Sequence, residues 1–248
     1  MMRLSQFIDS TYLKTANQAG ISEEETIKNV QGLIAEAIEF NFKLVMIRAA
    51  YISLAKEMIE KSNATVLVGT VIGFHEGNLA TNEKLFEAKK AIDLEVDELD
   101  FVANYTAFKS GDLDLVIKEL VACTQLGLNH NKVVKWIIEV AALTNKEIAE
   151  ISALIKKVVF DNFGKENAAN VFVKSSTGFF KTVSGKPNGA TFESIKIMSE
   201  NAKPLKIKAA GGVKTKEDAL KMITLGVDRI GTSSAKQIIS GELTSTSY

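Results

Sequence analysis

The sequence predicts a single (β/α)8 barrel, the TIM-barrel fold, over residues 1–248, and three observations support this. Short apolar runs alternate with amphipathic segments eight times along the chain. The 248 residues divided among eight units give about 31 residues per unit, as in barrels of this type. The competing doubly wound sheet is disfavoured because neither G-x-G-x-x-G nor G-x-x-x-x-G-K-[ST] occurs in the chain.

The predicted strands are short runs rich in β-branched and large apolar residues, which is typical of strands buried in a parallel sheet. In chain order they are Gln6–Ile8, Lys43–Ile47, Val66–Ile72, Glu98–Val102, Val133–Val140, Val171–Lys174, Leu205–Ala209 and Arg229–Gly231. The chain has two prolines and no Ser-, Gly- or charge-rich stretch that resembles a linker. We therefore expect one domain.

Helix-start signals stand between several of these strands. A Ser or Thr followed three residues later by Glu or Asp predicts a capping box, in which each side chain bonds the other's backbone N–H. Such pairs occur at Ser22 with Glu25, Thr144 with Glu147 and Thr215 with Asp218, and Asp112 is a further candidate cap. Apolar residues at helical spacing follow each signal.

The charge balance excludes several classes of protein. The chain has 30 basic and 30 acidic side chains, whereas binding to nucleic acid or a membrane surface needs a basic excess. No apolar run approaches the roughly 18 residues of a membrane-spanning helix, and residues 1–14 lack the apolar core of a signal peptide. We expect a cytoplasmic protein with no nucleic-acid or membrane partner.

The composition also disfavours metal chemistry. The sequence contains only two histidines, His75 and His130, and one cysteine, Cys123, whereas a catalytic zinc normally takes three protein ligands. Cys123 has no second cysteine with which to form an internal disulfide. We expect no metal site, and we expect the chemistry to rest on Lys, Asp, Glu, Ser, Tyr or backbone amides.

Candidate catalytic side chains stand at the predicted strand ends, where barrel active sites lie. Lys174 follows the apolar run Val171–Val173, and a charged group resists burial in such surroundings. Desolvation and a second cation lower the pKa of a lysine, which leaves a neutral amine able to attack a carbonyl. Lys208, on the next predicted strand, could supply the cation, and Asp100 could relay protons.

A structural interpretation competes for each of these lysines. A lysine at a strand end often extends to solvent or pairs with a nearby acid. Two lysines and an aspartate at the ends of different strands favour a functional site over that interpretation. Lys135 shares its parity with Glu139 on the fifth predicted strand, and its position fits an ion pair inside the barrel as well as a catalytic role.

Glycines form a second group of candidate residues. Gly211–Gly212 and Gly231–Ser234 follow the last two predicted strands, where barrels often bind phosphate. Glycine permits the close approach of an anion to backbone N–H groups. Tight turns explain most single glycines, but two such loops in adjacent units favour a phosphate site. Ser175–Gly178 adds hydrogen-bond donors beside Lys174.

With these residues in view, the sequence resembles the deoxyribose-phosphate aldolases. Two segments are specific to that family, Val173–Phe179 (VKSSTGF) and Lys208–Thr215 (KAAGGVKT). Further matching segments extend the resemblance over nearly the whole chain. They are Phe7–Lys14, Thr70–Phe74, Phe86–Lys89, Asp97–Asp100, Lys109–Asp112 and Arg229–Ser234.

The resemblance implies a class I aldolase that needs no cofactor. Such an enzyme cleaves 2-deoxy-D-ribose 5-phosphate reversibly to acetaldehyde and D-glyceraldehyde 3-phosphate. Lys174 matches the lysine that forms the Schiff base, Lys208 the second lysine that perturbs it, and Asp100 the proton-shuttling aspartate. Asp9 matches a supporting acid on the first strand. Tyr248 resembles the tyrosine with which tails in the family end and which reaches into the site.

The resemblance also implies binding partners. The phosphate of the substrate would be held at Gly178, Gly211, Gly212, Ser233 and Ser234. Small aldehydes and a sugar phosphate are the expected ligands. The outward helix faces do not fix the oligomeric state, and a homodimer is one candidate assembly.

The chain departs from the family pattern beside the second and third strands. Many members have V-C-V where this sequence has Val45–Ile47, and His75 replaces the proline of a G-F-P loop. These changes bear on pocket shape and on the aldehyde accepted, not on Lys174, Lys208 and Asp100. Two alternatives stay open: another Schiff-base aldolase or transaldolase acting on a different sugar phosphate, and a catalytically silent sugar-phosphate binder.

Overall fold

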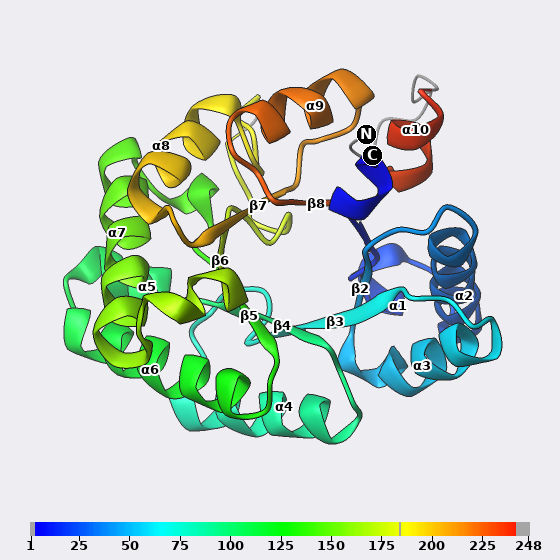
Figure 1. Cartoon of the computed structure of the whole chain (residues 1–248), viewed down its shortest axis with the longest axis horizontal. Helices are drawn as coiled ribbons and strands as arrows, with labels where there is room; N and C mark the ends of the chain where they lie inside the picture. Colours follow the sequence, from blue (N-terminus) through cyan, green and yellow to red (C-terminus); the bar gives the residue numbers. More distant parts are fainter. Residues whose placement is uncertain (1–2, 184, 242–248) are drawn as a thin grey trace.

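The computed structural model describes residues 3–183 and 185–241. Within these residues, eight parallel strands close into a barrel in the order of the chain, and helices surround it (Figure 1). The strands are β1 (Ile8–Thr11), β2 (Leu44–Ile47), β3 (Leu67–Ile72), β4 (Glu98–Val102), β5 (Val133–Ile137), β6 (Val171–Lys174), β7 (Lys206–Ala210) and β8 (Arg229–Thr232). The predicted (β/α)8 fold is confirmed.

The first predicted strand is wrong. Leu4–Phe7 forms the 3-10 helix η1, and β1 begins at Ile8. Hydrophobicity failed as a guide there because the buried residues Asp9 and Ser10 are polar. The fifth predicted strand is too long, since β5 ends at Ile137 and Glu139 has a left-handed backbone (φ 55°).

The helices follow the strands as the start signals predict. In the described part of the chain they are α1 (Ala16–Ala19), α2 (Glu23–Glu39), α3 (Ile52–Lys61), α4 (Thr81–Asp93), α5 (Tyr105–Ser110), α6 (Leu113–Asn129), α7 (Asn145–Phe163), α8 (Phe192–Ala202), α9 (Lys216–Thr224) and α10 (Ala235–Ser240). Further 3-10 turns are η2 (Ala49–Tyr51), η3 (Val140–Ala142) and η4 (Lys165–Asn170).

Three of the four capping predictions are confirmed, and the predicted capping box at Thr215 forms only in part. Reciprocal capping boxes form at Ser22 and Thr144. Asp112 accepts a hydrogen bond from the backbone N–H of Leu115 and caps α6. Thr215 caps α9 by accepting from the N–H of Asp218, without the return bond of a full box.

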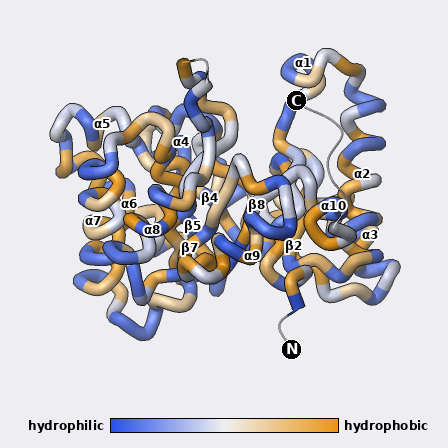
Figure 2. The backbone as a smooth tube through the Cα atoms, turned by 90° about the horizontal axis from the view of Figure 1, so that it is seen from above, coloured by the Kyte–Doolittle hydropathy of each residue, from blue (hydrophilic) through white to orange (hydrophobic). Residues whose placement is uncertain are grey.

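The main hydrophobic core lies between the barrel and its helices. Trp136 of β5 is fully buried and stacks on Phe101 of β4, with ring centroids 5.2 Å apart. Its indole N–H donates to Thr124 of α6 at 3.0 Å. In Figure 2, hydrophobic and hydrophilic stretches alternate along the outer helices, as expected if one face of each helix packs on the barrel.

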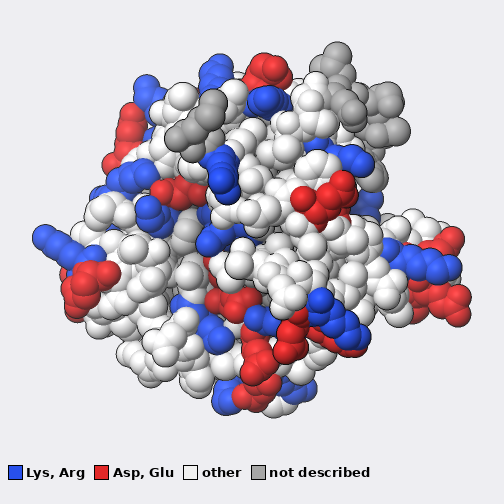
Figure 3. Space-filling view, turned by 45° about the vertical axis from the view of Figure 1, so that its right-hand side comes forward, with Lys and Arg blue, Asp and Glu red and all other residues white. Residues whose placement is uncertain are grey.

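The surface carries both signs of charge. On the face shown in Figure 3, basic and acidic side chains are interspersed over several elements. This agrees with the formal net charge of zero. None of the helices within residues 3–183 and 185–241 is long and apolar enough to cross a membrane.

Candidate active site

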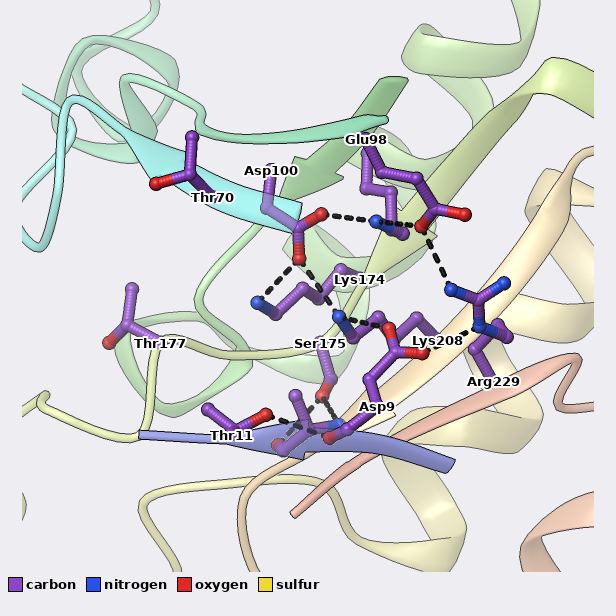
Figure 4. A network of polar contacts seen from close by, with 12 residues as sticks. Asp9, Thr11, Thr70, Glu98, Asp100, Lys174, Ser175, Thr177, Lys208 and Arg229 are labelled. Carbon is purple, nitrogen blue, oxygen red and sulfur yellow. Dashed lines mark hydrogen bonds and ion pairs between the residues drawn. The ribbon is translucent and has the colours of Figure 1, made fainter. Parts of the chain in front are cut away.

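A cluster of buried, charged side chains lies inside the barrel (Figure 4). The side chains come from β1 and from β4 to β8, and all are at most 6% exposed. This buried cluster consists of Asp9, Glu98, Asp100, Lys135, Lys174, Lys208 and Arg229. Because side chains alternate across a strand, Glu98 and Asp100 both point inward from β4.

Asp100 is the centre of the cluster. Its Oδ1 accepts a hydrogen bond from Lys135 Nζ at 2.5 Å. Its Oδ2 accepts from Lys174 Nζ at 2.8 Å and from Lys208 Nζ at 2.9 Å. The parallel register places Lys174 of β6 directly beside Lys208 of β7. The two amines therefore share one carboxylate oxygen.

The two remaining acids, Asp9 and Glu98, pair with the other basic groups of the cluster. Asp9 pairs with Lys208 Nζ at 2.6 Å and with Arg229 Nε at 2.6 Å. Glu98 pairs with Lys135 Nζ at 2.6 Å and with the Arg229 guanidinium at 2.9 Å. Every acid in the cluster is thus shared between basic groups.

The surroundings of Lys174 favour its neutral form. Burial lowers the pKa of Lys174, and Lys208 lowers it further. Asp100 opposes both effects, and the result is a pKa of about 8 instead of 10.5. Burial alone would raise the pKa of Asp100, but Lys135, Lys174 and Lys208 outweigh it and hold that pKa well below its usual value.

The charged forms of Asp9 and Lys135 are favoured. Burial would raise the pKa of Asp9, but Arg229 and Lys208 outweigh it and lower the pKa to about 2. Burial would lower the pKa of Lys135, but Asp100 and Glu98 raise it above its usual value. Lys174 is therefore the cluster member whose pKa lies nearest to neutral pH among those with a resolved shift.

The structure brings together four of the predicted catalytic residues, Lys174, Lys208, Asp100 and Asp9. Tyr248 lies outside the described residues. For Lys135, the sequence left an ion pair and a catalytic role open, and the structure shows ion pairs with Asp100 and Glu98.

Sequence reasoning assigned no role to Glu98 or Arg229. The parity of Glu98 with Asp100 is the signal that could have placed Glu98 inside the barrel. Arg229 was missed because it stands at the start of a strand, whereas functional groups were expected at strand ends. Its inward direction follows only from the register of β8 with β1 and β7.

The predicted phosphate loops also meet in space. Gly178, after β6, and Gly211 and Gly212, after β7, have left-handed backbones with φ of 80°, 75° and 81°. A Cβ built on Gly211 would lie 3.0 Å from the Cα of Gly189 and 3.8 Å from that of Gly178. The backbones approach so closely that a side chain at Gly211 would crowd the loop.

The loop after β8 is tied to the loop after β7. Thr232 Oγ1 donates to the carbonyl oxygen of Val213 at 2.9 Å and accepts from the N–H of Ser234 at 3.0 Å. Ser233 is exposed and Ser234 is half-buried. These serines therefore lie on a loop that Thr232 holds against the glycine loop.

Aromatic side chains lie at the mouth of the barrel. Phe179, after β6, contacts Phe74 edge-to-face at 5.0 Å and stacks on His75 at 5.6 Å. His75, Phe179 and Phe180 line a cavity of about 710 Å³. The contact links the loop after β3 with the loop after β6, which carries Gly178.

Comparisons with known proteins identify the family. Residues 7–241 match the family model of the DeoC/LacD family aldolases. The chain belongs to this family. The deoxyribose-phosphate aldolase of Metamycoplasma arthritidis is 39% identical over 92% of this chain and 96% of its own. That of Thermococcus gammatolerans is 37% identical over 97% of this chain and 96% of its own.

Solved structures agree with this aldolase in fold. A putative deoxyribose-phosphate aldolase from Coccidioides immitis has a TM-score of 0.80 and 30% identity, and the match covers 97% of this chain and 86% of that one. The tetrameric deoxyribose phosphate aldolase from Aeropyrum pernix has a TM-score of 0.76 and 26% identity, with 96% and 89% covered. The chain is an enzyme of the aldolase type, a carbon–carbon lyase.

Proposed function

We propose that this aldolase cleaves 2-deoxy-D-ribose 5-phosphate reversibly to acetaldehyde and D-glyceraldehyde 3-phosphate through a Schiff base on Lys174. The observation that carries the proposal is the buried amine of Lys174, whose pKa is lowered to about 8 and which lies 2.8 Å from Asp100. The names of the relatives support the choice of substrate.

Lys174 is the nucleophile in this mechanism. Its neutral Nζ adds to the C1 aldehyde of the open-chain sugar, and the carbinolamine loses water to give an iminium ion. Removal of the C3 hydroxyl proton then breaks the C2–C3 bond, and the electron pair of that bond moves toward the iminium nitrogen. D-Glyceraldehyde 3-phosphate leaves, and an enamine stays on Lys174.

Asp100 and Lys208 move the protons. Asp100 Oδ2 lies within hydrogen-bond distance of both Lys174 Nζ and Lys208 Nζ. The Asp100 carboxylate can therefore accept a proton from Lys174, and Lys208 can donate one at the same oxygen. Protonation of the enamine at C2 and hydrolysis of the iminium release acetaldehyde and regenerate the amine.

The loops after β6, β7 and β8 hold the phosphate. Left-handed glycines expose backbone N–H groups to an anion, and serine hydroxyls are further donors. When the phosphate is held in these loops, C1 of the substrate lies against Lys174 Nζ. Binding energy of the phosphate is thereby used to orient the reacting carbon. The residues of this site are Gly178, Gly211, Gly212, Ser233 and Ser234.

Trapping tests the nucleophile. The protein is incubated with acetaldehyde, reduced with borohydride and digested, and the modified peptide is identified by mass spectrometry. We expect one ethyl group on Lys174 and none in the Lys174→Met variant, with the partly exposed Lys206 as an internal control for non-selective modification. A selective adduct on another lysine, or no selective adduct, would contradict the assignment.

A coupled assay with 2-deoxyribose 5-phosphate and with 2-deoxyribose tests the substrate. We expect the phosphorylated sugar to have the lower KM, and Gly211→Ala to remove most of that advantage. An adduct on Lys174 without turnover of the phosphorylated sugar would favour an aldolase or transaldolase for another sugar phosphate.

The homodimer and the cytoplasmic location stay predictions, which light scattering and cell fractionation test.

A further inference from the structure

Arg229 is a buried cation that lies away from the reacting amine. It stands at the start of β8 and is 6% exposed. Its Nε donates to Asp9 Oδ1 at 2.6 Å, and its Nη2 donates to Glu98 Oε2 at 2.9 Å. Both contacts are with acids, and neither acid forms an ion pair with Lys174 in the described part of the chain.

These contacts determine how the carboxylates of the cluster are divided. Asp9 is shared between Arg229 and Lys208, and Glu98 is shared between Arg229 and Lys135. Lys208 and Lys135 therefore also draw on Asp100, which Lys174 needs as its counter-ion. If Arg229 were uncharged, Asp9 and Glu98 would satisfy their lysines, and Asp100 would be left to Lys174.

The charge count leads to the same conclusion. Of the side chains named in the buried cluster, four are basic and three are acidic. A guanidinium keeps its proton at all accessible pH values, so Arg229 cannot relieve the excess positive charge by losing one. Lys174 has a 3% exposed side chain, whereas the side chains of Lys135 and Lys208 are fully buried. Loss of one proton from Lys174 balances the cluster.

We propose that Arg229 is a positioning residue for the reaction: by occupying Asp9 and Glu98, it leaves Lys174 with only a share of Asp100 and thereby makes its ammonium easier to deprotonate to the nucleophilic amine. The inference rests on the proposed function, in which Lys174 forms the Schiff base. Arg229 acts through the carboxylates and touches no reacting atom.

Two further groups could affect Lys174. The carboxyl of Glu139, which follows β5, interacts with Lys174 electrostatically. It accepts hydrogen bonds from the hydroxyl and the N–H of Thr177 and makes no ion pair with the cluster. Tyr105 of α5 faces Glu139, and both burial and that carboxyl raise its pKa. Neither group contacts Arg229, so variants at Arg229 leave both in place.

The test measures how the rate of trapping by acetaldehyde and borohydride at Lys174 depends on pH. We expect Arg229→Met to raise the midpoint of this profile by about one pH unit, since removing one charge at a distance on the order of 10 Å shifts a pKa by that much at an effective dielectric constant of about 20. Trapping below the midpoint then becomes about tenfold slower. Arg229→Lys keeps the charge and should keep the midpoint.

Glu98→Gln makes the opposite change with little change in shape. It removes one negative charge, so the midpoint should fall, and combining it with Arg229→Met should return the midpoint to that of the unmodified protein. A merely structural role for Arg229 would lower the maximal rate without moving the midpoint, and Glu98→Gln would not restore it. If Arg229→Met does not fold, Glu98→Gln alone decides, because an unchanged or higher midpoint overturns the proposal.

The outcomes separate this inference from the proposed function. If the unmodified protein gives no adduct on Lys174 at any pH, the proposed function fails. If the adduct forms but Arg229→Met and Glu98→Gln both leave the midpoint unchanged, only the role of Arg229 fails. Shifts in opposite directions, with restoration in the double variant, support both.

Discussion

Replacing Lys174 by Met removes the proposed nucleophile, and we expect the folded protein to become more stable. The physical reason is the burial of the ammonium group, which lowers the pKa of Lys174 from 10.5 to about 8. An unfolded chain has no such penalty because its lysine is in water. Methionine has a similar length and no charge, and Asp100 keeps Lys135 and Lys208 as partners.

The size of the gain follows from the pKa. Each pKa unit corresponds to about 1.4 kcal/mol, so lowering the pKa from 10.5 to about 8 destabilises the folded state by about 3 kcal/mol when Lys174 is charged. This penalty is complete below about pH 8. It decreases as the pH rises toward 10.5, because only the unfolded chain still binds the proton, and it is absent above that value.

Urea unfolding, followed by the fluorescence of the single tryptophan, Trp136, measures the effect. The free energy of unfolding of Lys174→Met should exceed that of the unmodified protein by about 3 kcal/mol near neutral pH, and the difference should shrink by about 1.4 kcal/mol per pH unit above about pH 8. Lower stability of the variant at neutral pH, or a difference independent of pH, would refute the reasoning.

Lys135→Met is the matched control, because it makes the same substitution in the same cluster. Burial lowers the pKa of Lys135, but Asp100 and Glu98 outweigh it and raise the pKa above its usual value. The charged form is therefore the favoured one in the folded state. We expect this variant to lose about 3–5 kcal/mol, as when one partner of a buried ion pair is removed. If both variants changed the free energy of unfolding in the same direction, side-chain packing and not charge would determine both changes.

Four further predictions concern the reaction and the loops. The value of kcat/KM should fall about tenfold per pH unit below about pH 8, since only the neutral amine of Lys174 reacts; a flat profile from about pH 6 to 8 would contradict this. Asp100→Asn should lower kcat by about 10²–10⁴-fold in a coupled assay, while acetaldehyde still forms a trapped adduct on Lys174. Lys84→Met breaks the buried pair with Glu119 and frees the carbonyls of Gly77 and Val102, to which Lys84 Nζ donates; urea unfolding should show a loss of about 3–5 kcal/mol. Gly189→Ala places a Cβ 2.5 Å from the carbonyl carbon of Gly211, so KM should rise by about 10–100-fold for the phosphorylated sugar and little for 2-deoxyribose.

Most strands could be predicted from the sequence because burial in a parallel sheet demands apolar runs. Val171–Lys174 and Glu98–Val102 have the predicted bounds. The criterion failed at β1, where Asp9 and Ser10 are buried polar residues. A strand that contributes to a charged interior cannot be recognised by hydrophobicity, because its inward positions carry polar side chains that other strands neutralise.

Part of the candidate site could also be predicted from apolar runs in the sequence. Lys174, Lys208 and Asp100 were found because each follows or interrupts an apolar run, and the barrel places strand ends together. Their mutual contacts were not predictable. Lys174 and Lys208 both contact one oxygen of Asp100, and this contact depends on the register of β4 to β7 and on the direction of each side chain.

The sequence by itself determined the alternation of strands and helices, the starts of several helices, the family and the identity of the central lysines and aspartate. These properties depend on local periodicity and on motifs of a few neighbouring residues. Only the tertiary structure decided which acid neutralises which base, and it showed that Arg229 and Glu98 belong to the same cluster as Lys174. The pairing joins residues as far apart in the chain as Asp9 and Arg229, and only closure of the barrel brings such residues into contact, where burial makes each shared charge affect the others.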